Sequence, residues 1–424
     1  MSTFLVEHGT LLLALACLFG FFMAWGVGAN DVANAMGTSV GSKALTIKQA
    51  ILIAMIFEFC GAYFAGGEVT DTIKNGIVHT DAVEPNLLVI GMLSALLAAG
   101  TWLLIASTKG WPVSTTHTII GAVIGFAAVG ISFDAVQWSA ILPITASWVV
   151  TPFISGAVAF MLFISVQHLI MNTEDPFANA KRYVPMYMFV TGFMVAIMTL
   201  SKGLKHVGIN LSNEQSVLLS LMVGGVVMTL GVILLRRIRL PEGANRSQLY
   251  GSTEKVFAIL MIFTACSMAF AHGANDVANA VGPLAAIASV VSSAGDTAID
   301  LAAKTAVPTW VLFLGASGIV VGLATYGYKV IATIGGQITE LTPSRGFAAE
   351  LATASTVVGA SAFGMPVSTT HTLVGAVLGI GLARGISALN LQVIGSIFMS
   401  WAITLPAGAL LSILFFTIMR YIFL

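Results

Sequence analysis

Long uninterrupted apolar runs, separated by short polar segments, dominate the hydropathy pattern of this chain. Clear examples are Leu11–Ala29, Leu87–Ser107, Gln215–Leu235 and Thr305–Tyr328. A helix of about 20 apolar residues is long enough to cross a bilayer. The runs are continuous and do not alternate with polar residues, which disfavours a strand-based barrel. The pattern therefore predicts an all-α, multi-pass membrane protein of roughly 12 transmembrane segments.

Two apolar stretches, Ala135–Thr173 and Gly385–Met419, are too long for a single crossing and contain no Asp, Glu, Lys or Arg. Each contains a duplicated tryptophan fragment with a proline after it: Ser147-Trp148-x-x-Thr151 with Pro152, and Ser400-Trp401-x-x-Thr404 with Pro406. Because proline breaks or kinks helices, we predict that each stretch forms two helical pieces.

Two polar motifs occur twice, in the same order. Gly-Ala-Asn-Asp-Val-Ala-Asn-Ala is found at Gly28–Ala35 and Gly273–Ala280, and Pro-Val-Ser-Thr-Thr-His-Thr at Pro112–Thr118 and Pro366–Thr372. A weaker echo pairs Asp71–Ile77 with Ala332–Ile338. We infer two homologous halves, 9–171 and 255–420, and a connector at 172–254 with helices near 183–201 and 215–235. Duplicated halves with polar segments at membrane depth are typical of secondary transporters, which predicts inverted repeats and broken or hairpin helices at the midplane.

The Pro-Val-Ser-Thr-Thr-His-Thr segments have the chemistry of an anion site. Proline suits the first turn of a helix, and a helix that begins inside the membrane directs free N–H groups and a positive dipole end at an anion. The alternative is that the hydroxyls bond back to their own helices. The predicted anion ligands are Ser114, Thr115, Thr116, Ser368, Thr369 and Thr370. For His117 and His371 we favour structural hydrogen bonding over direct ligation.

The octapeptides have the chemistry of a cation site, because carboxylate and amide oxygens are ligands of hard cations. An unpaired Asp at mid-bilayer costs roughly 2.5–3.5 kcal/mol, whereas a helix-joining hydrogen bond, the alternative role, contributes roughly 0.6 kcal/mol. Flanking glycines would permit an unwound backbone here. The predicted cation ligands are Asn30, Asp31, Asn34, Asn275, Asp276 and Asn279. Glu58 and Glu350, two further acids within apolar runs, are accessory candidates.

Composition and charge narrow the functional class. Hydrophobic residues make up 57% of the chain, charged residues 8%, and the net charge is zero, so nothing suggests nucleic-acid binding. The three cysteines show no metal or redox spacing, and no nucleophile–base pair or HExxH motif is present, so we expect neither a cofactor nor an enzyme. Basic residues crowd Arg236–Lys255, which predicts a cytoplasmic loop.

Through its duplicated G-A-N-D-x-A-N-A signatures and P-x-S-x-T-H segments, almost the whole chain resembles the inorganic phosphate transporter (PiT) family, in its prokaryotic form. The resemblance implies that the hydroxyl motifs bind phosphate and the octapeptides bind sodium. In the weaker echo, Asp71 is opposite Ala332 and Gly76 is opposite Gln337. An accessory role for Asp71, or a phosphate-binding role for Gln337, would therefore be unique to one half.

We therefore expect a symporter that imports phosphate with sodium by alternating access across the inner cell membrane. Two equivalent cation sites suggest at least two sodium ions for each phosphate. The alternatives are a proton-coupled phosphate permease or a sulfate permease and, from other classes, an anion channel or an intramembrane enzyme. The expected partners are phosphate, sodium and the lipid bilayer, and a homodimer is left open.

Overall fold

The computed structural model describes residues 3–79, 83–201, 209, 211–293, 307–334, 341–385 and 391–424. Within these residues the chain is helical, and the β-structure is one isolated bridge between Val78 and Val136. Nine of the described helices are long and apolar enough to cross a membrane. The predicted all-α, multi-pass fold is confirmed. Among the described residues, the short helices at the two hydroxyl motifs, Thr115–Gly125 and Thr369–Arg384, are not counted in these nine.

The helices follow the order of the repeats. The first half contains α1 (Thr3–Gly41), α2 (Ile47–Ala65), α3 (Gly67–Asn75), α4 (Pro85–Thr108), α5 (Thr115–Gly125) and α6 (Trp138–Val166). The connector carries α7 (Pro176–Ser201) and α8 (Asn213–Leu235). The second half contains α9 (Arg246–Ser292), α10 (Thr309–Gly322), α11 (Tyr328–Ile334), α12 (Pro343–Ala362), α13 (Thr369–Arg384) and α14 (Leu391–Phe423).

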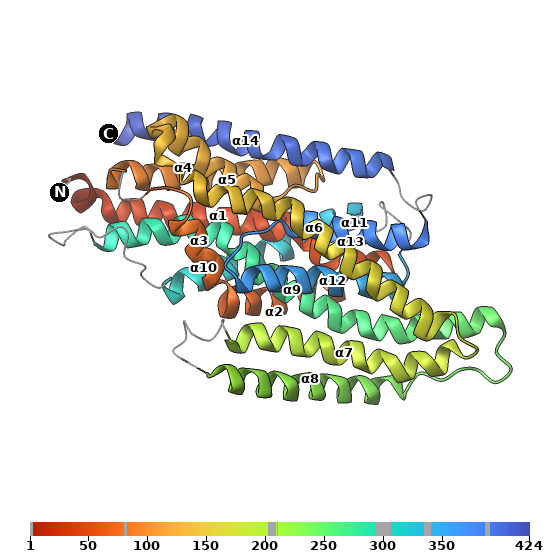
Figure 1. Cartoon of the computed structure of the whole chain (residues 1–424). Coiled ribbons are helices and arrows are strands. Elements are labelled where there is room, and N and C mark those ends of the chain that lie inside the picture. The colour runs from red at the N-terminus through yellow and green to blue at the C-terminus, as the bar shows by residue number, and fades with distance from the viewer. Residues whose placement is uncertain are drawn as a thin grey trace.

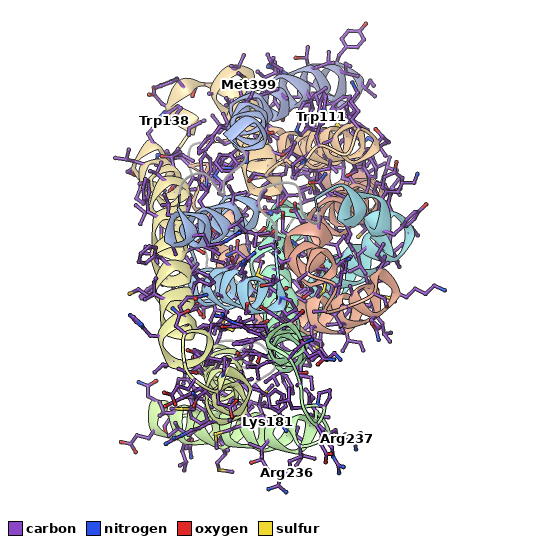
Figure 2. The ribbon with its side chains drawn as sticks, turned by 90° about the vertical axis from the view of Figure 1, so that its right-hand side faces the viewer. Trp111, Trp138, Lys181, Arg236, Arg237 and Met399 are labelled. Atoms are coloured by element: carbon purple, nitrogen blue, oxygen red, sulfur yellow. The ribbon has the colours of Figure 1, made fainter. Side chains whose placement is uncertain are left out.

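The connector helices form an outer layer of the bundle. Figure 1 shows α7 and α8 along one side of the molecule and α4, α5 and α14 along the other. Figure 2 shows Lys181, Arg236 and Arg237 in the connector layer, on the opposite side of the bundle from Trp111 and Met399. Both chain termini lie at one end of the helices, and the α8–α9 turn lies at the other end. The two halves therefore surround a common centre, and the connector stays outside it.

The octapeptides lie within continuous helices, α1 and α9, so the predicted unwinding at their glycines is wrong. The glycines instead permit close helix packing. A Cβ atom on Gly28 would lie 1.9 Å from the Ile319 carbonyl oxygen of α10. A Cβ atom on Gly273 would lie 2.2 Å from the Glu58 carbonyl oxygen of α2. The backbones of α1 and α10, and of α9 and α2, touch only because a side chain is absent.

The long stretches around the tryptophan fragments also form continuous helices, α6 and α14, so the predicted break in each is wrong. Side chains can bond the carbonyl groups that an internal proline leaves free in a membrane helix. Pro152 has no N–H for the Trp148 carbonyl four residues earlier, yet α6 continues to Val166, with α13 packed so closely that a Cβ atom on Gly375 would lie 2.2 Å from the Pro152 carbonyl oxygen. The helix can therefore continue through its proline.

Two helical hairpins, α4–α5 and α12–α13, carry the hydroxyl motifs at their tips. Gly110 and Gly364 take the same left-handed conformation there, each with a φ of 67°. Pro112 and Pro366 lie two residues before the helix caps, not within the first turn as predicted. The hairpins are the interrupted segments that the sequence places inside the membrane.

Candidate functional site

The two serines of the hydroxyl motifs cap helices α5 and α13. Ser114 Oγ accepts a hydrogen bond from the His117 N–H at 3.2 Å. Ser368 Oγ accepts one from the His371 N–H at 3.3 Å. The first N–H groups of a helix have no partner within it. Since the serines take only the histidine N–H groups, the N–H groups of the threonine pairs remain available to a ligand. Those threonines are Thr115 and Thr116, and Thr369 and Thr370.

The structure brings the two hydroxyl motifs together at the centre of the bundle. Thr116 Oγ1 donates to the Val367 carbonyl at 3.0 Å, and Thr370 Oγ1 donates to the Val113 carbonyl at 3.4 Å. Each threonine thus reaches the hairpin of the other half. The two helix starts lie in one cluster rather than on opposite faces of the membrane.

The first asparagine of each octapeptide holds the hairpin of its own half. Asn30 Nδ2 donates to Ser107 Oγ and to the Trp111 carbonyl, both at 3.1 Å. Its Oδ1 accepts from the Val113 N–H at 3.4 Å. The second half repeats all three bonds, between Asn275 and Ser361 (2.8 Å), Met365 (3.2 Å) and Val367 (3.2 Å). Asn30 and Asn275 are therefore positioning residues in this structure.

The aspartates of the octapeptides accept the hydroxyls of the hairpins. Thr115 Oγ1 donates to Asp31 at 2.7 Å, and Thr369 Oγ1 donates to Asp276 at 2.8 Å. Both carboxylates are fully buried. The phosphate-binding and sodium-binding candidates are thus parts of a single hydrogen-bonded network.

The second asparagine of each octapeptide bonds across to the opposite half. Asn34 Nδ2 donates to Thr370 Oγ1 at 2.8 Å and to Asp31 Oδ1 at 3.0 Å. Asn279 Nδ2 donates to Thr115 Oγ1 at 3.1 Å. These crossed bonds link the two halves directly at the site.

Two buried oxygen atoms of the second octapeptide have no hydrogen-bond partner among the described residues. They are Asp276 Oδ1 and Asn279 Oδ1, three residues apart on α9. Buried polar atoms are seldom left unbonded. A carboxylate oxygen and an amide oxygen on one helical face are suitable ligands for a hard cation. This pair is the part of the predicted cation site that is open to a ligand.

His272 belongs to the site, although the sequence analysis did not single it out. Its Nε2 lies 3.0 Å from Asp276 Oδ2 and 3.9 Å from Asp31 Oδ2. Asp31, His272 and Asp276 form a buried group whose spacing could hold a metal ion. The sequence signal for His272 was its position directly before the second octapeptide. The equivalent position before the first octapeptide is occupied by Val27.

Glu58, an accessory candidate, pairs with His272 and has no polar counterpart in the other half. Its Oε1 lies 3.3 Å from His272 Nδ1, and both side chains are fully buried. Gly273 packs on Glu58 as Gly28 packs on Ile319. The residues equivalent to Glu58 and His272 are therefore Ile319 and Val27, both apolar and buried. The Glu58–His272 pair thus breaks the symmetry of the site.

Glu350 lies fully buried in a separate polar cluster. Thr38 Oγ1 and Ser39 Oγ donate to its Oε1 at 2.6 and 2.5 Å, and Thr264 Oγ1 donates to its Oε2 at 2.6 Å. Thr38 is one helical turn beyond Asn34 on α1. The cluster therefore lies beside the central network, with the carboxylate bonded by hydroxyls from α1 and α9.

The remaining candidates lie outside the central network. Asp71 is exposed on α3, and Gln337 lies outside the described residues. His117 and His371 pack against each other, with ring centroids 4.3 Å apart. The structural role predicted for both histidines stays a prediction.

Comparison with known proteins gives one consistent result. The sequence pattern of the phosphate transporter family matches residues 27–412. A putative phosphate permease of Haemophilus influenzae is 54% identical, over 98% of this chain and 99% of its own length. The chloroplastic inorganic phosphate transporter 2-1 of Arabidopsis thaliana is 41% identical, over 98% of this chain and 72% of its own.

A solved structure described as the sodium-dependent phosphate transporter is also similar. It superposes with a TM-score of 0.89 at 39% identity, covering 97% of this chain and 99% of its own. Both the sequence and the arrangement of helices are thus shared along nearly the full length. The chain belongs to the phosphate transporter family and is a multi-pass membrane phosphate permease, not an enzyme.

Proposed function

We propose that the protein imports inorganic phosphate together with sodium ions, by alternating access across the inner cell membrane. The observation that carries this proposal is the network at the centre of the bundle. It joins two buried aspartates to the starts of two helices from opposite halves. A similar solved structure is described as sodium-dependent, which supports sodium as the coupled ion.

Phosphate fits the hydroxyl motifs because they offer neutral donors. The free N–H groups at the starts of α5 and α13, together with the threonine hydroxyls, can bond the oxygens of one anion. No Lys or Arg is among the described hydrogen-bond partners of these threonines. An oxyanion would thus be held by helix dipoles and hydroxyls.

Charge balance makes ion coupling necessary. Asp31 and Asp276 are fully buried, and an anion beside them would add further negative charge to the site. Buried charges require compensation, and His272 is the one basic side chain that contacts these aspartates among the described residues. Co-bound sodium ions, with Asp276 Oδ1 and Asn279 Oδ1 among their ligands, would supply the rest. Phosphate and sodium should therefore bind together.

Alternating access follows from two related halves that share one site. We assign 9–171 and 255–420 to the two transporting halves and 172–254 to the connector. A contact made by one half in one state can then be made by its counterpart in the opposite state. Substrate and ions drive the change only if they bind the two states differently.

Uptake of radiolabelled phosphate into proteoliposomes tests the proposal. An inward sodium gradient should drive accumulation, excess sulfate should compete weakly, and Asp276→Asn should strongly reduce the sodium-driven component. Uptake that follows a proton gradient and ignores sodium would favour proton coupling instead. Flux that never saturates and needs no cation would indicate a channel.

A further inference from the structure

An apolar groove opens between α6 and α14, with α13 along its floor. Its volume is about 990 Å³. The duplicated tryptophan fragments, which the transport site does not use, line its two sides: Trp148 and Pro152 on α6, and Trp401 and Pro406 on α14. The groove therefore gives a structural role to a motif that occurs once in each half.

The floor of the groove adjoins the proposed phosphate site. His117 and His371 line it, and they directly follow Thr116 and Thr370. The His117 ring lies 3.8 Å from that of Trp148, and the His371 ring lies 3.4 Å from that of Trp401. The Nε2 atoms of both histidines are buried, without a partner in the part of the chain described. A molecule in the groove would therefore meet mainly ring carbons.

The surroundings identify what fills the groove. Two of its walls are membrane-spanning segments, Trp138–Met171 and Trp401–Phe423. Large apolar side chains face outward along it, with Phe153 75% exposed and Met161 61% exposed. The core of a bilayer holds no water to solvate such a surface, and the volume lies in the usual range for small-molecule sites, roughly 300–1,000 Å³. We propose that an acyl chain of a membrane lipid occupies the groove and modulates transport.

The acyl chain would act on transport through the histidines at the floor of the groove. An acyl chain between α6 and α14 contacts His117 and His371. Through these residues it displaces the first turns of α5 and α13. The threonine N–H groups of those turns are the proposed phosphate donors. The chain length and unsaturation of the bilayer lipids would therefore change the transport rate.

Bromine quenches tryptophan fluorescence on contact, which gives a test of binding that does not require transport. The probe is a vesicle of phosphatidylcholine brominated at mid-chain. The quenching due to Trp148 and Trp401 is the quenching measured in the parent protein minus that measured in the Trp148→Phe/Trp401→Phe double variant. Ala157 and Ala402 are exposed and line the groove, so Ala157→Phe/Ala402→Phe should fill it and abolish most of that component. Ala146→Phe, an exposed position on α6 outside the groove, is the matched control.

Equal quenching in the filled and parent proteins would overturn lipid binding. If the filled variant instead changes from dimer to monomer with its quenching intact, a second copy of the chain occupies the groove and the proposal is wrong. In the transport arm, the uptake rate of the parent should vary with acyl-chain length, and that of the filled variant should not. A parent rate insensitive to chain length would refute the modulation.

Discussion

At the scale of single residues, Thr115 and Thr369 connect the two kinds of ligand that the site is proposed to hold. Each hydroxyl bonds an aspartate, and each belongs to the first turn of a helix that we propose faces the anion. Thr115→Val or Thr369→Val should weaken phosphate transport about tenfold or more. A hydrogen bond to a charged group contributes roughly 1.5–3 kcal/mol. The apparent affinity for phosphate in uptake assays is the measurement.

Thr118→Val is the control for this prediction. Thr118 lies in the same helix, but its hydroxyl donates to the backbone carbonyl of Ser114 at 2.8 Å and not to the network. It should transport phosphate with nearly unchanged affinity. Unaltered affinity in both Thr115→Val and Thr369→Val would remove the hydroxyls from the phosphate site.

The Glu58–His272 pair leads to a prediction about stability. His272→Val alone should be strongly destabilising, because loss of one partner of a buried ion pair typically costs about 3–5 kcal/mol. Adding Glu58→Ile should recover part of that loss, because the equivalent pair in the other half, Val27 and Ile319, is apolar and buried. Thermal unfolding of the purified single and double variants in detergent measures this. A double variant no more stable than His272→Val would show that the two side chains are not coupled.

The repeats explain why much of the candidate site could be predicted from sequence. A polar residue that recurs in both halves stands out against apolar neighbours, as Asp31 and Asp276 do. His272 was missed because a residue present in one half gives no such signal. The positioning role of Asn30 was also hidden, since its partners are backbone and side-chain atoms about 80 residues away in sequence.

At the scale of elements, the glycines of the octapeptides control helix packing. Gly28→Ala should prevent α1 from approaching α10, because the new Cβ would lie 1.9 Å from a carbonyl oxygen. We expect little or no folded protein by fluorescence-detected size exclusion. Gly225→Ala on α8 is the matched control, with nothing within 4 Å of the added atom. It should be neutral or stabilising by roughly 0.5–1 kcal/mol. Similar yields for the two variants would contradict the packing described.

Helix type was more predictable than helix continuity. Apolar runs identified the membrane helices, but proline in α6 and glycine in α1 suggested interruptions that do not occur. Tertiary contacts decide such cases. The backbone of α10 occupies the space beside Gly28, and the backbone of α13 at Gly375 packs directly on Pro152 of α6. Neither partner is near in sequence, so local rules could not include it.

At the scale of the whole molecule, the basic α8–α9 turn predicts the orientation in the membrane. Arg237 and Tyr421 are both exposed. Arg237 belongs to the α8–α9 turn and Tyr421 lies three residues before the C-terminus, and Figure 1 shows that turn and that terminus at opposite ends of the bundle. In a variant without the native cysteines, Arg237→Cys should be protected from a membrane-impermeant thiol reagent in intact cells. Tyr421→Cys should react. The reverse labelling pattern would invert the assigned orientation.

The order of elements along the chain was predictable because duplicated motifs mark equivalent positions. The motifs did not reveal that the site crosses between the halves. The asparagine of one half bonds the threonine of the other, a pairing between residues 164 positions apart for Asn279 and Thr115. Only the packing of the two hairpins at one centre brings these groups together.

These crossed bonds have a consequence for ion titration. Thr115 accepts from Asn279 and donates to Asp31, so one hydroxyl connects the second octapeptide with the first. An ion that reorients Asn279 in one half must alter the ligand set of Asp31 in the other. Phosphate uptake should therefore rise sigmoidally with sodium concentration, as expected for energetically coupled sites. Asn279→Ala, which removes the shared donor, should make the curve hyperbolic. A curve of unchanged steepness would show that the two halves load independently.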